Sequence, residues 1–133
     1  MQNMEPDRYV ELSLPAEKDM MLLVRLAASG VLARSGVTVD RLDDLKMAVE
    51  EACCCMIDQI GENSRIRLRF DLEENRLSFT CSAADGCSAG KALDPAEREV
   101  AVCILESLVD SAEADVCEDG VIRSIRLSLA LPC

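Results

Sequence analysis

The stretch DRLDDLKMAVEEACCCMIDQIG, residues 40–61, contains the most regular amphipathic pattern in the chain. Its apolar residues recur every three or four positions, which places them on one face of a helix. Thr38 or Asp40 can cap the start of this helix, and Gly61 follows its end. The apolar face consists of Leu42, Leu45, Val49, Ala52, Cys53, Met56, Ile57 and Ile60. We therefore expect one long helix with a single buried face.

The residues before this helix predict a strand followed by another helix. Residues 9–14 alternate between apolar and polar side chains, which is the period of a half-buried strand, and Pro15 ends it. From Ala16 to about Arg34, apolar residues again recur at helical spacing. The predicted buried positions of this helix are Met20, Leu23, Val24, Ala27, Ala28, Val31 and Leu32.

The residues after the long helix predict two hairpins separated by a third helix. Residues 65–70 and 76–81 alternate around a turn at residues 73–75, and residues 114–117 and 121–131 flank a second turn. Residues 82–91 have no periodicity and predict a loop. Asp94, Pro95 and Glu97 are typical of a helix start. The predicted buried face of the third helix is Val100, Ala101, Ile104, Leu105, Leu108 and Val109.

The predicted order is strand, helix, helix, strand, strand, helix, strand, strand. This order indicates an α+β protein, a two-layer sandwich with helices on one face of a mixed sheet. We expect residues 1–133 to form a single domain, with residues 1–7 flexible. The other face of the sheet would carry Arg65, Arg67, Arg69, Arg76 and Arg126. These arginines have two interpretations, a solvated face paired with nearby acids or a docking patch for an acidic partner.

The composition excludes several classes of function. The net charge of −11 repels nucleic acid and anionic membranes, and only three residues are aromatic. The absence of histidine excludes Ser-His-Asp and Cys-His catalysis and the common zinc sites that need imidazole. No apolar run is long enough to span a bilayer and the N-terminus has no leader pattern, so we expect a cytoplasmic protein.

The eight cysteines are the most unusual part of the composition. Cys53, Cys54 and Cys55 are consecutive, so on a helix they point in different directions and suit neither a disulfide framework nor a shared metal. We expect the thiols to stay reduced and most of them to act as small buried apolar residues. The acidic residues around Cys53 to Cys55 predict raised thiol pKa values and low reactivity.

Residues 43–53, DDLKMAVEEAC, resemble the second helix of the bacterial anti-sigma-factor serine/threonine kinases, which belong to the GHKL (Bergerat) ATPase superfamily. The predicted element order is also that of this family's histidine-kinase-like ATPase fold. Residues 104–110, ILESLVD, resemble the helix that follows the family's glycine box. The resemblance extends from Leu12 to Leu131 and implies the Bergerat fold.

The resemblance implies a role for two residues of the long helix. In the family, a glutamate acts as the base and an asparagine one turn later coordinates the magnesium that bridges the ATP phosphates. Glu51 matches the glutamate, and the asparagine position is Cys55. A thiol is a soft ligand that binds magnesium poorly. Glu51 would then be a vestigial base, or a solvated acid on the polar side of the helix.

The family's other nucleotide-binding boxes are also incomplete. The adenine-binding aspartate falls on Ala83, or on Asp85 followed by Gly86 if two residues are inserted. The glycine box falls on residues 98–101, REVA, which contain no glycine. The loop between the two boxes is short, so little chain remains to form a nucleotide lid. Cys55, Asp85 and Gly86 would thus line a degenerate nucleotide pocket, and we expect no cofactor, with ATP and magnesium required only if the site is still competent.

These observations lead to three hypotheses of different classes. The first is an anti-sigma-like regulator that binds a sigma factor or an anti-anti-sigma (STAS) protein, as a possible homodimer, with weak or lost ATP binding. The second is an active serine-protein kinase that phosphorylates an anti-anti-sigma factor, with Glu51 as base and Asp85 reading adenine. The third is a redox or metal sensor that uses Cys53, Cys54 and Cys55.

Overall fold

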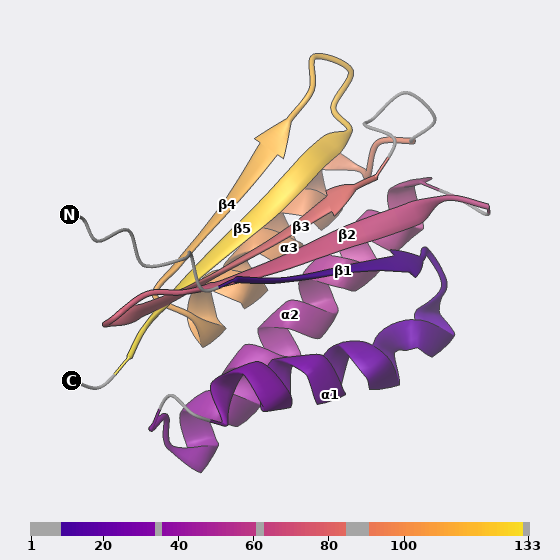
Figure 1. Ribbon diagram of the computed structural model, residues 1–133. Coiled ribbons are helices and arrows are strands. Elements are labelled where there is room, and N and C mark those ends of the chain that lie inside the picture. Colours follow the sequence, from indigo (N-terminus) through magenta and orange to yellow (C-terminus); the bar gives the residue numbers. More distant parts are fainter. Residues whose placement is uncertain (1–8, 34–35, 61–62, 85–90, 132–133) are drawn as a thin grey trace, which may run out of the picture.

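The predicted order of strands and helices is confirmed (Figure 1). The computed structural model describes residues 9–33, 36–60, 63–84 and 91–131. A short 3-10 turn, η1 (Lys18–Met20), lies where the first helix was expected to begin. The elements are β1 (Tyr9–Pro15), α1 (Met21–Leu32), α2 (Val39–Ile60), β2 (Arg65–Leu72), β3 (Arg76–Ala83), α3 (Pro95–Leu108), β4 (Ser111–Val116) and β5 (Ile122–Ala130).

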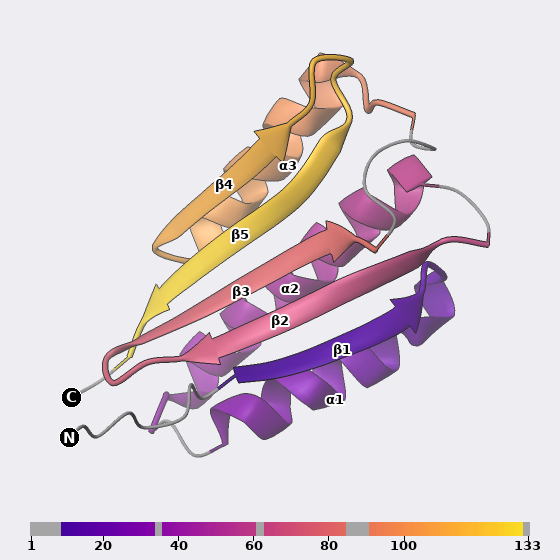
Figure 2. The same cartoon turned by 45° about the horizontal axis from the view of Figure 1, so that its top comes forward.

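The sheet has the strand order β1-β2-β3-β5-β4, and every neighbouring pair is antiparallel (Figure 2). The expectation of a mixed sheet is therefore wrong. The connections explain the difference. The helix pair α1 and α2 returns the chain to the end of the sheet where β1 stopped, so β2 runs back along β1. The single helix α3 carries the chain from the end of β3 to the opposite end, and β5 then enters between β3 and β4 antiparallel to both.

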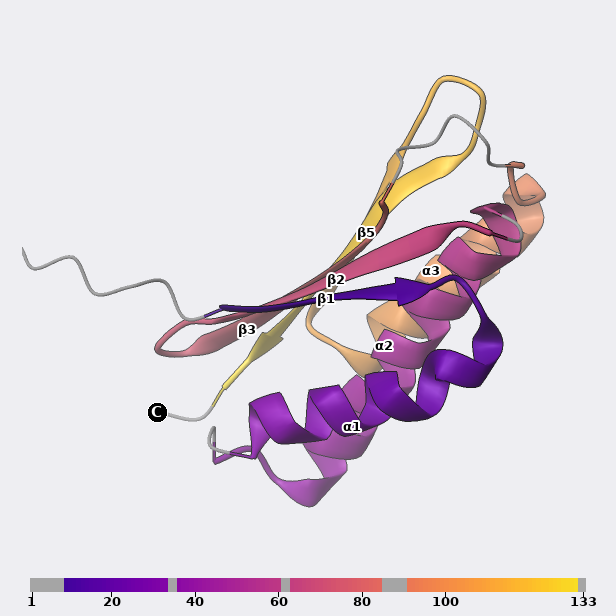
Figure 3. The same ribbon diagram turned by 45° about the vertical axis from the view of Figure 1, so that its right-hand side comes forward.

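All three helices lie on one face of the sheet, as the edge-on view shows (Figure 3). The core fills the space between these two layers. The inward-facing residues of β2 and β3 alternate with outward-facing ones, as predicted, and they are Ile66, Leu68, Phe70, Leu77, Phe79 and Cys81. The rings of Phe70 and Phe79 pack against each other across these strands, with their planes tilted by 50° and their centroids 4.9 Å apart. The predicted two-layer α+β sandwich is thus confirmed.

The long helix α2 forms as its sequence pattern predicts. Thr38 caps it, because its Oγ1 accepts a hydrogen bond of 3.3 Å from the backbone N–H of Arg41. Its predicted apolar face is buried, apart from the half-buried Leu42. Gln59 is also buried, with 2% of its surface exposed. Its side chain accepts the N–H of Ile122 at 2.7 Å and donates to the carbonyl of Ile122 at 3.0 Å, which ties α2 to the start of β5.

Two positions predicted to be buried on α3 lie on the surface instead. Val100 is 59% exposed and Ile104 is 41% exposed, whereas Ala101 and Leu105 are buried. The reason is the position of α3 at one side of the helical layer, where it packs mainly against α2 and β4. The neighbouring elements therefore cover only part of the apolar face of α3. Leu23 on α1 is also exposed, for 45% of its surface.

None of the helices within the described residues is long and apolar enough to span a membrane. The cytoplasmic location and the single domain over residues 1–133 stay predictions. The flexibility expected for residues 1–7 concerns a segment outside the described residues.

Candidate functional site

A cavity of about 380 Å³ lies between α2 and α3 on the outer side of the helical layer. It brings together Glu51 and Cys55, the two α2 residues that the sequence predicted to share a site. The sequence reasoning missed Asp58 and Glu97, although the seven-residue spacing from Glu51 to Asp58 is a signal for a shared helix face. The described residues that line the cavity are Glu51, Cys55, Asp58, Leu93, Ala96, Glu97, Val100, Ala101 and Ile104.

Glu51 and Cys55 lie one helical turn apart and contact each other. The thiol of Cys55 donates a hydrogen bond to Oε1 of Glu51, with a sulfur-to-oxygen distance of 3.9 Å. Asp58, on the same side of α2, forms an ion pair with Lys18, whose Nζ lies 2.8 Å from Oδ1. The Asp58 carboxylate is thus partly neutralised, while Glu51 has no ion-pair partner among the described residues and accepts a hydrogen bond from a neutral thiol.

Burial and the neighbouring Glu51 carboxylate raise the pKa of Cys55 to about 12. The side chain is therefore a neutral thiol at physiological pH. Magnesium requires hard oxygen ligands in octahedral geometry, and a neutral thiol supplies none. The donor set at this position therefore does not fit a magnesium ion.

The start of α3 differs from a phosphate-binding helix N-terminus. Asp94 occupies the predicted N-cap position, but its side chain forms no capping hydrogen bond. Pro95 has no N–H to donate, and Glu97 places a carboxylate in the first turn. The residues aligned with the glycine box, 98–101, lie inside the helix. The N–H of Arg98 already donates to the carbonyl of Asp94 at 2.9 Å.

The remaining predicted site residues follow β3. Ala83 ends this strand and is half-buried against the core. Its methyl side chain has no group that could form a hydrogen bond with a nucleotide base. Asp85 and Gly86 lie outside the described residues, so their part in a nucleotide pocket stays a prediction.

The consecutive cysteines point to different surroundings, as expected for a helix. Hydrogen bonding to Cys81, followed by burial, raises the pKa of Cys53, and burial raises the pKa of Cys54. Within the described ranges, no group of three or more cysteine or acidic side chains is arranged to hold a metal ion. Cys117, in the turn after β4, is disulfide-bonded. The expectation that every thiol stays reduced is therefore wrong for Cys117. This residue lies far in sequence from Cys53, Cys54 and Cys55, the helical cysteines from which a disulfide framework was excluded.

These raised pKa values predict unreactive thiols on α2. In the native protein at pH 8, iodoacetamide is expected to alkylate the exposed Cys103 while leaving Cys53 and Cys55 unmodified, because the thiolate is the reacting form. Alkylation of Cys55 should become appreciable only as the pH approaches 12. Mass spectrometry of the digested protein measures each site. Equal labelling of Cys55 and Cys103 at pH 8 would contradict the prediction and revive the sensor hypothesis.

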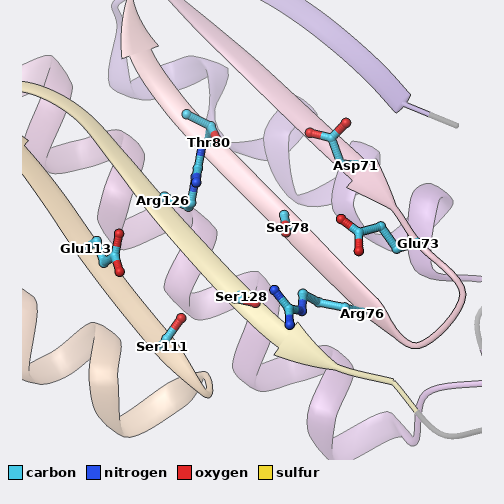
Figure 4. Close-up of a pocket in the computed structure, with 9 residues that line it drawn as sticks. All are labelled: Asp71, Glu73, Arg76, Ser78, Thr80, Ser111, Glu113, Arg126 and Ser128. Atoms are coloured by element: carbon cyan, nitrogen blue, oxygen red, sulfur yellow. The ribbon is translucent and has the colours of Figure 1, made fainter. Parts of the chain in front are cut away.

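The open face of the sheet carries charges of both signs, and Figure 4 shows Arg76 and Arg126 among them. Arg67 and Arg69 line another depression, and Arg65 donates hydrogen bonds to the hydroxyl and the carbonyl of Ser13. Arg69 forms an ion pair with Asp71 at 2.9 Å, and its guanidinium lies 4.0 Å above the ring of Tyr9. A depression of about 330 Å³ on this face has Arg76 and Arg126 among its lining residues. Its other charged residues are Asp71, Glu73 and Glu113. This mixture favours the solvated-face interpretation over a docking patch for an acidic partner.

A family model described as a histidine kinase-like ATPase domain matches residues 14–127. The serine-protein kinase RsbW of Bacillus subtilis (strain 168) is 38% identical over 72 residues, which cover 52% of this chain and 45% of that protein. The serine-protein kinase RsbW of Bacillus velezensis is 42% identical over 72 residues, with the same coverage. The chain thus spans about half the length of the curated relatives it matches.

Among solved structures, the RsbU and RsbW domains of a Mycobacterium tuberculosis protein superpose with a TM-score of 0.70. The match covers 95% of this chain and 33% of that chain at 16% identity, so it shows the fold. The predicted resemblance to the bacterial anti-sigma-factor serine kinases is confirmed by these comparisons. Because the family model covers 14–127 of the 133 residues, the chain belongs to the histidine kinase-like ATPase domain family.

Proposed function

We propose that this protein is an anti-sigma-like regulator that controls transcription by binding other proteins, with weak or lost ATP binding and kinase activity. Its partner would be a sigma factor, an anti-anti-sigma (STAS) protein, or both, in the cytoplasm. The possible homodimer belongs to the same proposal. The kinship with RsbW supports the regulatory role.

The observation that carries the loss of ATP binding is the position of residues 98–101 inside α3. A phosphate group needs free backbone N–H groups at a helix N-terminus. In this chain those N–H groups are directed into the helix, where the N–H of Arg98 already has a partner. The vestigial role of Glu51 follows from the same reasoning. Its carboxylate would lack both a magnesium ligand beside it, because Cys55 is a neutral thiol, and a held phosphate to act upon.

The alternative is an active ATP-dependent serine-protein kinase that phosphorylates an anti-anti-sigma factor. The names of the relatives favour it, since both RsbW proteins are described as serine-protein kinases. In that case Glu51 would act as the base and Asp85 would read the adenine. The carboxylates of Glu51, Asp58 and Glu97 in the α2–α3 cavity would all oppose a bound triphosphate.

A titration with Mg-ATP separates the two functions. We expect no heat of binding by calorimetry at millimolar nucleotide and no rise in the melting temperature. A ligand at one tenth of its Kd stabilises a protein by only about 0.06 kcal/mol. A measurable heat together with a raised melting temperature would favour the kinase. The variant Cys55→Asn, which restores an oxygen ligand, tests whether this single position limits binding.

The regulatory role is tested by purifying the tagged protein from its native bacterium and identifying what accompanies it. We expect a sigma factor or an anti-anti-sigma protein in the purified complex. Recovery of neither, from cells in which both classes are expressed, would count against the proposed function.

A further inference from the structure

The groove between α2 and α3 presents an apolar floor to solvent. Val100 and Ile104 lie four residues apart on α3, so they share one face of the helix and project into the cavity together. The half-buried Leu93 and the buried Ala101 continue this floor. One exposed aliphatic residue is ordinary on a protein surface, but a contiguous set that lines a cavity of about 380 Å³ indicates a binding surface.

The rim of the groove is acidic. Glu51 and Asp58 stand on the α2 side and Glu97 on the α3 side, and none of the described lining residues is basic. Asp58 is paired with Lys18, but no described cation pairs with Glu51 or Glu97. Two carboxylates on opposite sides of an apolar floor are therefore left without a counter-charge.

We propose that this groove binds an amphipathic segment of a protein partner. Aliphatic side chains of the partner pack on Val100 and Ile104, and a lysine or arginine of the partner lies between Glu51 and Glu97. The inference rests on the proposed function, because it assigns a protein ligand to the site where the family's nucleotide would lie. The lining residues of α3 run from Ala96 to Ile104, and eight helical steps cover about 12 Å, which suits two to three turns of a partner helix.

Charge and shape both favour this occupant. A cationic side chain between two unpaired carboxylates gains attraction, and aliphatic side chains on the floor remove apolar surface from water. A second copy of this chain is a poorer fit, because each copy carries a net charge of −11. A nucleotide would bring additional negative charge to the same rim.

The test measures binding of a fluorescent model peptide, with leucine and lysine at helical spacing, to the 133-residue chain. Its counterpart has glutamate in place of lysine. We expect the lysine peptide to bind and the glutamate peptide not to bind. Glu97→Lys should weaken binding of the lysine peptide by at least about tenfold, and Val100→Ser should weaken it by about threefold to tenfold.

Matched controls separate the groove from general electrostatics. Glu106 lies nine residues after Glu97, on the opposite side of α3, so Glu106→Lys makes the same change of charge away from the groove. Val39 is 73% exposed at the start of α2, so Val39→Ser matches Val100→Ser. Both controls should keep the Kd within about twofold of the parent protein. Circular dichroism verifies that each variant is folded.

The outcomes distinguish this inference from the function on which it rests. Failure of the lysine peptide to bind, or equal weakening by Glu97→Lys and Glu106→Lys, would overturn the groove proposal. If Mg-ATP also shows no binding in that case, the proposed loss of nucleotide binding stands. If Mg-ATP binds and displaces the peptide, the groove is a nucleotide site and both proposals fail.

Discussion

Replacing Phe79 by alanine is expected to lower the free energy of unfolding by about 3–5 kcal/mol. Phe79 is completely buried at the centre of the sheet's inner face, where its ring packs 4.9 Å from that of Phe70. The chain has only these two phenylalanines, so the smaller aliphatic residues around them cannot fill the space that a lost ring leaves. Against a total stability of about 5–15 kcal/mol, this loss is a large fraction.

Urea denaturation followed by circular dichroism measures this effect. Tyr9→Ala is the matched control, because it also removes an aromatic ring from a strand, but that ring lies on the open face and is 45% exposed. Only a small change is expected there. A loss below about 1 kcal/mol for Phe79→Ala would mean that the two rings are not at the centre of the core.

Replacing Gln59 by leucine is expected to cost about 2–5 kcal/mol, although leucine is apolar and similar in size. The Gln59 amide satisfies both the N–H and the carbonyl of Ile122, at 2.7 and 3.0 Å, in a place with almost no access to water. Leucine would leave both backbone groups without these partners. Each buried polar group that loses its partner costs about 1–3 kcal/mol.

The variant Gln59→Glu distinguishes these hydrogen bonds from simple packing. An ionised carboxylate cannot donate to the Ile122 carbonyl, whereas a protonated carboxyl can donate to it and still accept the N–H. The difference in unfolding free energy between the parent protein and Gln59→Glu should therefore narrow as the pH falls towards about 4.3, the pKa of a glutamate in the unfolded chain, because burial raises the pKa of this carboxyl in the folded protein. A leucine variant as stable as the parent protein would contradict the role assigned to Gln59.

Periodicity predicted the fold well because it acts locally. The apolar spacing in residues 40–61 and the alternation in residues 65–81 are properties of single elements, and the structure retains both. Periodicity does not determine how much of an apolar face becomes covered. Val100 and Ile104 belong to the apolar face of α3, but α3 packs mainly against α2 and β4, so these two side chains remain exposed.

The candidate site was predictable only in part, for the same reason. The four-residue spacing of Glu51 and Cys55 places them together on α2, and the structure brings them into contact. The approach of Glu97 from α3 depends on how two helices pack, which no local pattern encodes. The burial of Gln59 depends on a backbone partner 63 residues away, so a polar residue next to Ile60 gave no sign of its role.

The insertion of β5 between β3 and β4 makes the assembly of this sheet strongly interdependent. β4 precedes β5 in the chain, yet among the described strands β4 pairs with β5 alone. Until β5 is in place, one edge of β3 therefore lacks its hydrogen-bonding partner strand. The strand β4, against which α3 packs, is then not yet joined to the sheet. The interior position of a strand that follows β4 in the chain means that the sheet is complete only once β5 has been added, and it disfavours partially folded states in which only the β1–β3 half is stable.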